Sequence, residues 1–399
     1  MQTGIANVPL HGGHCPPWLF EKMKQLGAVM VEVIVLEYGP AEVLRRLSDP
    51  VWFQTFGSVL GFDWHSSGLT TVVCGALKEG LGKSQGELGI FFAGGKGKAS
   101  RKTPQEIAEA GEKYGLSNDL AALQGTSRLV AKVDSAAVQD GYQLYHHFFI
   151  FDQAGNWAVI QQGMNKENRY ARRYHWLSED LHSFVDDPHS GICGLPEANV
   201  LNLVYHDNQA TRKASVELCQ EKPELVSKIY KSIARVNQPK PAYQQLSLFD
   251  EQLRVGLEHE LATPAKSCRI MTMPKHHPIP SARYLDKILY QLYDRPPGSY
   301  KNLLERPGVG PSTLRALAMV AEVTHGALPS FQDPVRYTFA HGGKDNYPFP
   351  VQGADLTHSL EVLRTAINKA RLGEKDKLQS LRKLAQVEGR LVTQTCPQV

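Results

Sequence analysis

Residues 148–163, FFIFDQAGNWAVIQQG, decide the fold that we expect for the first half of the chain. Two runs of aromatic and β-branched residues lie on either side of residues 152–156, which are of turn-forming types. This pattern predicts two antiparallel strands joined by a short turn. Further apolar runs at 29–36 and 89–92 are also typical of strands, with glycine-rich turns and a few helical stretches between the runs. The chain up to about residue 204 is therefore predicted to form a mixed α/β domain.

The sequence changes character after residue 214, where helix-forming residues replace the alternating runs. Pro239 and Pro241 then favour an extended linker in NQPKPAYQQLSLFDEQ, residues 237–252. From residue 281 onward, apolar residues recur at the helical period, as in SARYLDKILYQLYD. We therefore expect an α+β protein in three parts. They are a mixed α/β domain over 1–214 that holds the candidate catalytic residues, a helix and proline-containing linker over 215–265, and a mostly α-helical domain over 266–399.

The composition is that of an ordinary protein of two domains, because 399 residues exceed what one hydrophobic core usually holds. A net charge of +4 is too small to indicate a nucleic-acid partner by itself. The six cysteines include no C-x-x-C pair, so we expect reduced thiols rather than a zinc ribbon or a disulfide framework. The start of the chain lacks a basic and apolar leader, and the longest apolar run, 28–36, is short and contains Glu32. We therefore expect a cytoplasmic protein without a membrane partner.

Residues 300–323, YKNLLERPGVGPSTLRALAMVAEV, place two glycines between segments of helical periodicity. Gly308 and Gly310 allow a tight backbone turn, and Pro311 favours the first turn of a second helix. Backbone amides at such a turn are able to bind a phosphate without contacting a base. A plain corner between two helices, which needs the glycines only for its geometry, is the alternative.

This turn resembles the helix-hairpin-helix motif of DNA-repair proteins. The matching residues are Leu304, Pro307, Gly308, Val309, Gly310 and Thr313, whereas Arg306 and Leu314 replace an apolar residue and a small alanine. The resemblance implies that the DNA backbone is bound by Gly308, Val309, Gly310, Ser312 and Thr313.

The same region looks like the helix-hairpin-helix base-excision glycosylases, in which an aspartate after the second helix takes part in catalysis. Asp333 stands at a similar place in this chain. Ser312 occupies the position of the lysine that defines the bifunctional members, so a Schiff-base mechanism is not expected there. A turn or a helix cap is the alternative role for Asp333.

Two glycine-rich stretches carry candidate phosphate contacts. GGKGKASRK, residues 94–102, follows the strand expected at 89–92, and we expect a flexible loop that clamps phosphates. Its spacing is not that of a P-loop. Its candidate DNA-binding residues are Lys96, Lys98, Arg101 and Lys102. Lys344, in the polar turn FAHGGKD at 339–345, is a further candidate, and a solvent-exposed loop is the alternative there.

The densest group of reactive residue types lies in KVDSAAVQDGYQLYHHFFIFD, residues 132–152. Strand alternation sends His146 and His147 to opposite faces of the sheet. Carboxylates with an imidazole suit Mg²⁺ or Mn²⁺, which would polarise a phosphodiester and supply a hydroxide nucleophile. We therefore predict a divalent metal and no nucleotide or organic cofactor. The predicted metal ligands are Asp134, Asp140, His147, His11 and His14.

Amides and guanidinium groups follow immediately downstream of this group and strengthen the prediction of a site. The candidate catalytic residues of the first domain are Asp134, Asp140, His146, His147, Gln161 and Gln162. Arg172 and Arg173 are candidate DNA contacts. The alternative is that the histidines are satisfied by hydrogen bonds in the core and that the aspartates cap turns.

The linker contains QLSLF, which resembles the short peptide by which bacterial replication and repair proteins bind the sliding clamp. The residues implied in that contact are Gln245, Leu246, Leu248 and Phe249. An extended peptide next to prolines suits such a contact. The leucines and the phenylalanine also fall at helical spacing, so packing on the protein's own domain is the alternative.

Five segments, spread over nearly the whole chain, resemble an uncharacterised prokaryotic family, domain-of-unknown-function family 763. They are TGIANVPLHGGH, VDSAAVQDGYQLYHH, QQGMN, ARRYHW and FAHGGKD. That resemblance implies no reaction, so the function has to be inferred from the site. We expect a DNA-binding, metal-dependent nuclease acting in DNA repair or replication. The alternatives are a glycosylase that uses Asp333, and a non-catalytic DNA-binding protein recruited by the sliding clamp.

Overall fold

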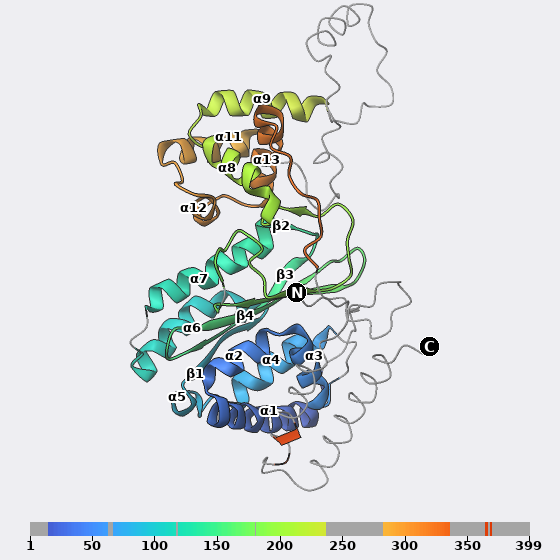
Figure 1. The fold of residues 1–399 in the computed structure, drawn as a ribbon, viewed down its shortest axis with the longest axis vertical. Helices are drawn as coiled ribbons and strands as arrows, with labels where there is room; N and C mark the ends of the chain where they lie inside the picture. The colour runs from blue at the N-terminus through green and yellow to red at the C-terminus, as the bar shows by residue number, and fades with distance from the viewer. Residues whose placement is uncertain are drawn as a thin grey trace, which may run out of the picture. The chain divides into compact units, whose positions relative to one another are not determined.

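The computed structural model describes residues 15–62, 67–116, 119–179, 181–236 and 282–335, together with residues 364, 365 and 368. Helices and antiparallel strands are mixed, so the predicted α+β class is confirmed (Figure 1). The chain divides into two compact units. The first unit comprises residues 1–135, 141–198 and 333–399, and the second comprises 136–140 and 199–332. The boundary expected at 214 lies instead inside α8 (Gln209–Glu217), and residue 333 returns to the first unit.

The first unit is built on a sheet of five antiparallel strands. In spatial order these are β1 (Ile90–Lys96), β3 (Gln143–Asp152), β4 (Trp157–Met164), β5 (Ala171–Leu177) and β6 (Gly191–Cys193). The hairpin predicted at 148–163 is confirmed as β3 and β4. The Asp152 carboxylate shapes its turn by accepting hydrogen bonds from the backbone N–H groups of Ala154 and Asn156, both at 2.9 Å.

Helices α1 (Pro17–Tyr38), α2 (Pro40–Ser48), α3 (Pro50–Val59) and α4 (Gly68–Gly80) cover one face of the sheet (Figure 1). The short α5 (Gln85–Leu88) precedes β1. The strand predicted at 29–36 is wrong, because this run belongs to α1. Its fully buried residues Met30, Val31 and Ile34 repeat at helical spacing, so one helical face enters the core.

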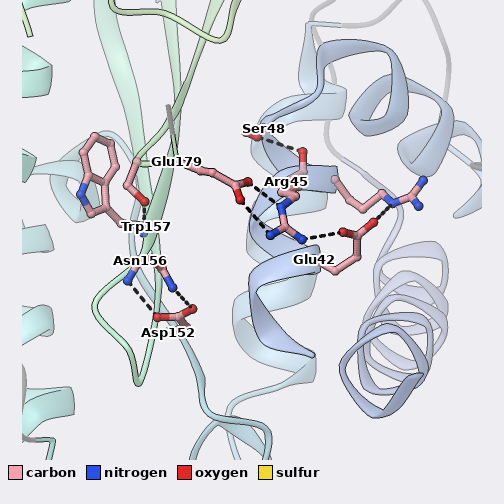
Figure 2. A network of polar contacts seen from close by, with 9 residues as sticks. Glu42, Arg45, Ser48, Asp152, Asn156, Trp157 and Glu179 are labelled. Carbon is pink, nitrogen blue, oxygen red and sulfur yellow. Dashed lines mark hydrogen bonds and ion pairs between the residues drawn. The ribbon is translucent and has the colours of Figure 1, made fainter. Parts of the chain in front are cut away.

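An ion-pair cluster joins α2 to the segment after β5, as Figure 2 shows. The Arg45 guanidinium donates to both carboxylate oxygens of Glu179, at 2.5 and 2.8 Å. Its Nη1 also donates to Glu42 at 3.1 Å. The bond from Arg45 lowers the pKa of the Glu179 carboxyl. The same figure shows the Asn156 side chain donating to Asp152 at 2.8 Å at the end of the hairpin.

Helices α6 (Lys98–Tyr114) and α7 (Leu120–Lys132) cover the opposite face of the sheet, and the π-helix η1 (Val133–Ala137) continues α7 (Figure 1). The His146 ring lies against Phe148, whose side chain joins the core formed with α1 to α4. The His147 ring lies against Phe149 and bonds to a residue of α7. The prediction that these two histidines point to opposite faces is therefore confirmed.

The second unit is mostly helical where it is described, as predicted for the later part of the chain. Its strands β2 (Val138–Gln139) and β7 (Leu201–Asn202) pair antiparallel. The remaining elements are η2 (His206–Asn208), α8, α9 (Pro223–Val236), α11 (Ala282–Asp294), α12 (Tyr300–Glu305) and α13 (Pro311–His325). Within the described segments of both units, no helix is long and apolar enough to cross a membrane.

The turn predicted between 300 and 323 joins α12 to α13. Val309 is fully buried beneath it, and the Tyr284 hydroxyl donates to the Gly308 carbonyl at 2.7 Å. Gly308 has φ +81°, and a Cβ there would lie 2.5 Å from Cδ1 of Ile288. Gly310 has no such constraint, since its φ is −130° and a Cβ would meet nothing within 4 Å. The two glycines therefore have different structural roles.

Gly308→Ala is expected to loosen this hairpin far more than Gly310→Ala, which serves as its matched control. Left-handed backbone strain and the displaced Ile288 side chain should together cost about 2 kcal/mol. Amide hydrogen exchange in α12 and α13 would then be faster by about 30-fold. Equal exchange rates in the two variants would show that Gly308 is not constrained in this way.

Candidate functional site

A pocket of about 250 Å³ lies between α6, α7 and the strands β3 and β4 of the first unit. Its lining residues are Ser100, Arg101, Pro104, Ser127, Arg128, Ala131, Leu144, His146, His147 and Gln161. Arg101, His147 and Gln161 are candidates from the sequence that the fold brings to one place, and His146, whose ring lies against Phe148, borders the pocket from β3. Ser127 and Arg128 join them from α7.

Three side chains at this pocket form a hydrogen-bonded row. The Ser127 hydroxyl lies 2.8 Å from Nε2 of His147, and Nδ1 of His147 lies 2.8 Å from Oε1 of Gln161. The Gln161 amide nitrogen donates to Asp134, which fixes the amide so that its oxygen faces the histidine. That oxygen only accepts, so Nδ1 of His147 carries the proton. Nε2 is then the acceptor, and the Ser127 hydroxyl donates to it.

Asp134 anchors this row from η1 and is completely buried. Its Oδ2 accepts from Gln161 and from the Trp176 indole N–H at 2.9 Å, and its Oδ1 contacts Nε2 of His189. A buried carboxylate is stable only when it is paired and hydrogen-bonded, and these partners meet that need. The π-helical turn that places Asp134 is a distortion that occurs often at functional sites.

Burial determines the charge states of the two strand histidines. It lowers the pKa of His147, against the opposing effects of the Gln161 bond and the Asp134 charge. The His147 imidazole is therefore neutral near pH 7, as a general base requires. Burial, with His147 and Lys96 nearby, also lowers the pKa of His146 to about 3. Neither ring nitrogen of His146 has a hydrogen-bond partner among the described residues.

Two exposed cations, Arg101 and Arg128, line the pocket, and three more stand at the end of β1 and the start of α6: Lys96, Lys98 and Lys102. No ion pair holds any of them in the part of the chain that the structure describes. The first five residues of α6 supply three of the five, and none of these helix positions is acidic. Positive charge without acidic partners favours an anionic ligand such as a phosphate.

The predicted loop at 94–102 is wrong in its structure, although its cations are exposed as a phosphate contact requires. Lys96 ends β1 and Lys98 begins α6, so Gly97 alone connects the two elements. Gly97 has φ +62°, which allows this abrupt change of direction. The lysines are therefore presented by a rigid strand-to-helix junction.

A family model described as "Protein of unknown function (DUF763)" matches residues 4–351. The chain belongs to this family. The resemblance noted in the sequence is thereby confirmed, and the family description carries no reaction. No curated protein and no solved structure matches the chain. The comparisons therefore give no support to a helix-hairpin-helix glycosylase domain in this DUF763 protein.

Arg172 and Arg173 were expected to contact DNA, and this is wrong, because both side chains are buried within the DUF763 fold. Arg172 forms an ion pair with Asp333. Arg173 donates to Nε2 of His175 at 2.8 Å and to Oε1 of Gln54 at 2.9 Å. Neither guanidinium is available to a phosphate at the surface. Both residues belong to β5, in which every residue except Leu177 is buried.

The hairpin candidates are only partly accessible. Gly308 is exposed, and Gly310 and Ser312 are partly exposed. The side chains of Val309 and Thr313 are buried, so only their backbone groups remain as candidate DNA contacts. Backbone amides at such a turn are able to bind a DNA phosphate without side chains. The burial of the Val309 and Thr313 side chains is therefore compatible with the contact that the resemblance implied.

The remaining catalytic candidates do not meet at the pocket. Asp333 belongs to the first unit, where its carboxylate bonds to Arg172 and to the backbone N–H of Glu197. Asp140 belongs to the second unit. Gln162 donates to the Ser67 carbonyl at 2.9 Å and to the Tyr145 hydroxyl. Two of these three side chains are thus used in contacts that hold the first unit together.

The metal site stays a prediction for this DUF763 chain. Among the described residues, no group of three or more His, Cys, Asp or Glu side chains is placed to hold a metal ion. Two predicted ligands, His11 and His14, lie outside the described residues, as do Lys344 and the linker peptide of Gln245, Leu246, Leu248 and Phe249.

Ser127, Arg128 and His189 are members of the site region that the sequence did not reveal. Ser127 and Arg128 lie on an amphipathic helix whose rotation relative to the sheet no local pattern fixes. His189 lies outside any strand or helix and meets Asp134 only through the fold. A helical serine at the position facing a strand histidine is a signal that becomes visible only once the packing is known.

Proposed function

We propose that this protein binds DNA and hydrolyses phosphodiester bonds at the pocket of its first unit. The observation that carries the proposal is His147, a neutral and oriented imidazole in a pocket whose charged lining residues, Arg101 and Arg128, are both cations. An imidazole of this kind is a general base, and cations stabilise the charge that develops on a phosphoryl group. The hairpin of the second unit supports DNA as the substrate through its glycine turn at the start of α13.

Each element of the site has a chemical role in this proposal. Arg101 and Arg128 hold the phosphate of the substrate at the pocket. His147 takes a proton at Nε2 from the attacking hydroxyl group and later returns it to the leaving oxygen. Gln161 and Asp134 keep the imidazole in the tautomer that leaves Nε2 free to accept. The charge of the buried Asp134 carboxylate also stabilises the imidazolium that forms between the two proton transfers.

Mg²⁺ or Mn²⁺ remains part of the proposal as an assisting ion, and recruitment by the sliding clamp through the linker peptide remains a proposal as well. Catalysis by Asp333 is the less favoured alternative, since its carboxylate is already bonded to Arg172. A non-catalytic DNA-binding protein is the other alternative. The same experiment separates these functions.

His147→Gln is expected to reduce DNA cleavage at least 100-fold, because general-base catalysis contributes about that much. Cleavage of labelled single- and double-stranded DNA would be measured in EDTA, in Mg²⁺ and in Mn²⁺. His206→Gln, an exposed histidine of the second unit, is the control and should retain the wild-type rate. If the wild-type protein binds DNA in a salt-dependent way but cleaves none under any condition, the non-catalytic DNA-binding function is supported instead. Release of free bases that Asp333→Asn abolishes would instead support a glycosylase.

A further inference from the structure

We propose that Ser127 is a nucleophile and that cleavage passes through a covalent phosphoserine at this residue. The inference rests on the proposed phosphodiester chemistry, and it adds a residue and an intermediate that the chemistry of His147 alone does not require. Three observations support it: the direction of the Ser127 hydroxyl, its hydrogen bond to His147, and the cationic pocket that Ser127 lines.

The hydroxyl of Ser127 does not behave like the other helical hydroxyls of this chain. A serine or threonine inside a helix commonly bonds back to the carbonyl four residues earlier. Thr55, Ser215 and Thr324 do so here, at 2.9, 2.7 and 2.8 Å. Ser127 instead has His147 as its hydrogen-bond partner within the described residues. Its hydroxyl is therefore directed at a base rather than at its own helix.

The row from Ser127 to Asp134 has the order of groups that activates a serine. A nucleophilic serine needs a base within about 2.6–3.2 Å and a third group that orients the base. His147 is at 2.8 Å from Ser127, and Gln161 orients it from the other ring nitrogen, also at 2.8 Å. Asp134 in turn holds the Gln161 amide. Every member of the row except Ser127 is thus fixed by a further bond on its far side.

The surroundings of Ser127 select a phosphoryl group over a neutral acyl group. Arg101 and Arg128 line the same pocket, and no carboxylate lines it. A phosphodiester brings one negative charge to the site and develops more as the nucleophile approaches, so two guanidinium groups match it. A pocket of about 250 Å³ is too small for a duplex and large enough for one phosphate with part of its sugar.

The reaction balances with water as the co-reactant. In the first step the Ser127 Oγ–P bond forms, the hydroxyl proton passes to Nε2 of His147, and the P–O bond to the leaving strand breaks. That leaving oxygen takes the proton from His147. In the second step water attacks phosphorus, gives its proton to His147, and the Oγ–P bond breaks. Ser127 recovers its proton from His147, and the strand end that carries the phosphate is released.

The test uses a fluorophosphonate probe on the full chain and needs no nucleic acid. The probe forms an Oγ–P bond at an activated serine and releases fluoride. We expect mass spectrometry of the wild-type protein to locate the adduct on Ser127, and we expect His147→Gln to slow labelling at least 100-fold. Ser100→Ala is the matched control, because Ser100 lines the same pocket but donates to the Gly97 carbonyl at 2.6 Å. It should be labelled at the wild-type rate.

Failure of this inference is distinguishable from failure of the proposed function. If wild-type protein cleaves DNA but Ser127 is not labelled and Ser127→Ala cleaves at the wild-type rate, Ser127 is not the nucleophile while the nuclease proposal stands. If Ser127 is labelled and His147→Gln prevents it, Ser127 is an activated nucleophile even when no DNA is cleaved, and the substrate assignment is then wrong. The position of the adduct is assigned on wild-type protein, so that assignment does not depend on the folding of any variant.

Discussion

Asp333→Ala is expected to lower the free energy of unfolding of the first unit by about 3–5 kcal/mol, the usual cost of leaving one member of a buried ion pair alone. The Asp333 carboxylate accepts from both terminal nitrogens of Arg172, at 3.0 and 2.8 Å. The Arg172 side chain is fully buried, with its guanidinium 4.6 Å from the Tyr142 ring centroid. Without Asp333, a guanidinium charge stays inside the protein with its main anionic partner removed.

Tryptophan fluorescence during urea unfolding would measure this loss, because all five tryptophans fall in residues 1–135 and 141–198 of the first unit. The matched control is the double variant Arg172→Met with Asp333→Ala. It removes the charge together with its partner, so it should be more stable than Asp333→Ala alone. A single variant as stable as the wild type would show that the ion pair is not structural, and would reopen the catalytic role of Asp333.

The sequence predicted the hairpin at 148–163 correctly because its signal is local. Turn-forming residues between two β-rich runs determine the pairing, and Asp152 closes the turn with its own side chain. The run at 29–36 failed for the opposite reason. A short run of apolar residues, here seven of the eight at 29–36, suits a buried strand or a buried helix equally, and the choice depends on flanking residues that continue the helical pattern over 22 positions.

The candidate site was predictable in its strand residues and not in its helical ones. His147 and Gln161 lie on adjacent strands of one hairpin, so their pairing follows from its register. Asp134 comes from η1, and Ser127 from α7, and only the packing of that helix on the sheet brings the four together. The error at Arg172 and Arg173 has a related cause. Charged residues usually lie at the surface, but here side chains and carbonyls from other elements accept hydrogen bonds from both guanidinium groups.

His146 and His175, two of the buried histidines, are together expected to reduce the stability of the first unit by about 4 kcal/mol when the pH is lowered from 7.5 to 5. Burial lowers the pKa of His146 to about 3, and burial with the Arg173 charge lowers the pKa of His175 well below its usual value. In the unfolded chain both titrate near pH 6.5. Below that pH the unfolded state binds protons that the folded state does not, so stability falls as the pH falls. Each histidine costs about 2 kcal/mol at pH 5, 1.5 pH units below 6.5.

Replacing one titrating group tests this origin of the pH dependence. His146→Gln keeps a polar side chain of similar size but removes the titration, so the difference in stability between pH 7.5 and pH 5 should shrink by about 2 kcal/mol. His206→Gln, with its side chain 55% exposed, is the matched control and should leave the difference unchanged. Urea unfolding followed by tryptophan fluorescence at both pH values gives the two differences. An equal loss of stability between pH 7.5 and pH 5 in wild type and in His146→Gln would mean that His146 takes up a proton in the folded protein at pH 5. A ligand or a neighbouring group would then stabilise its charge.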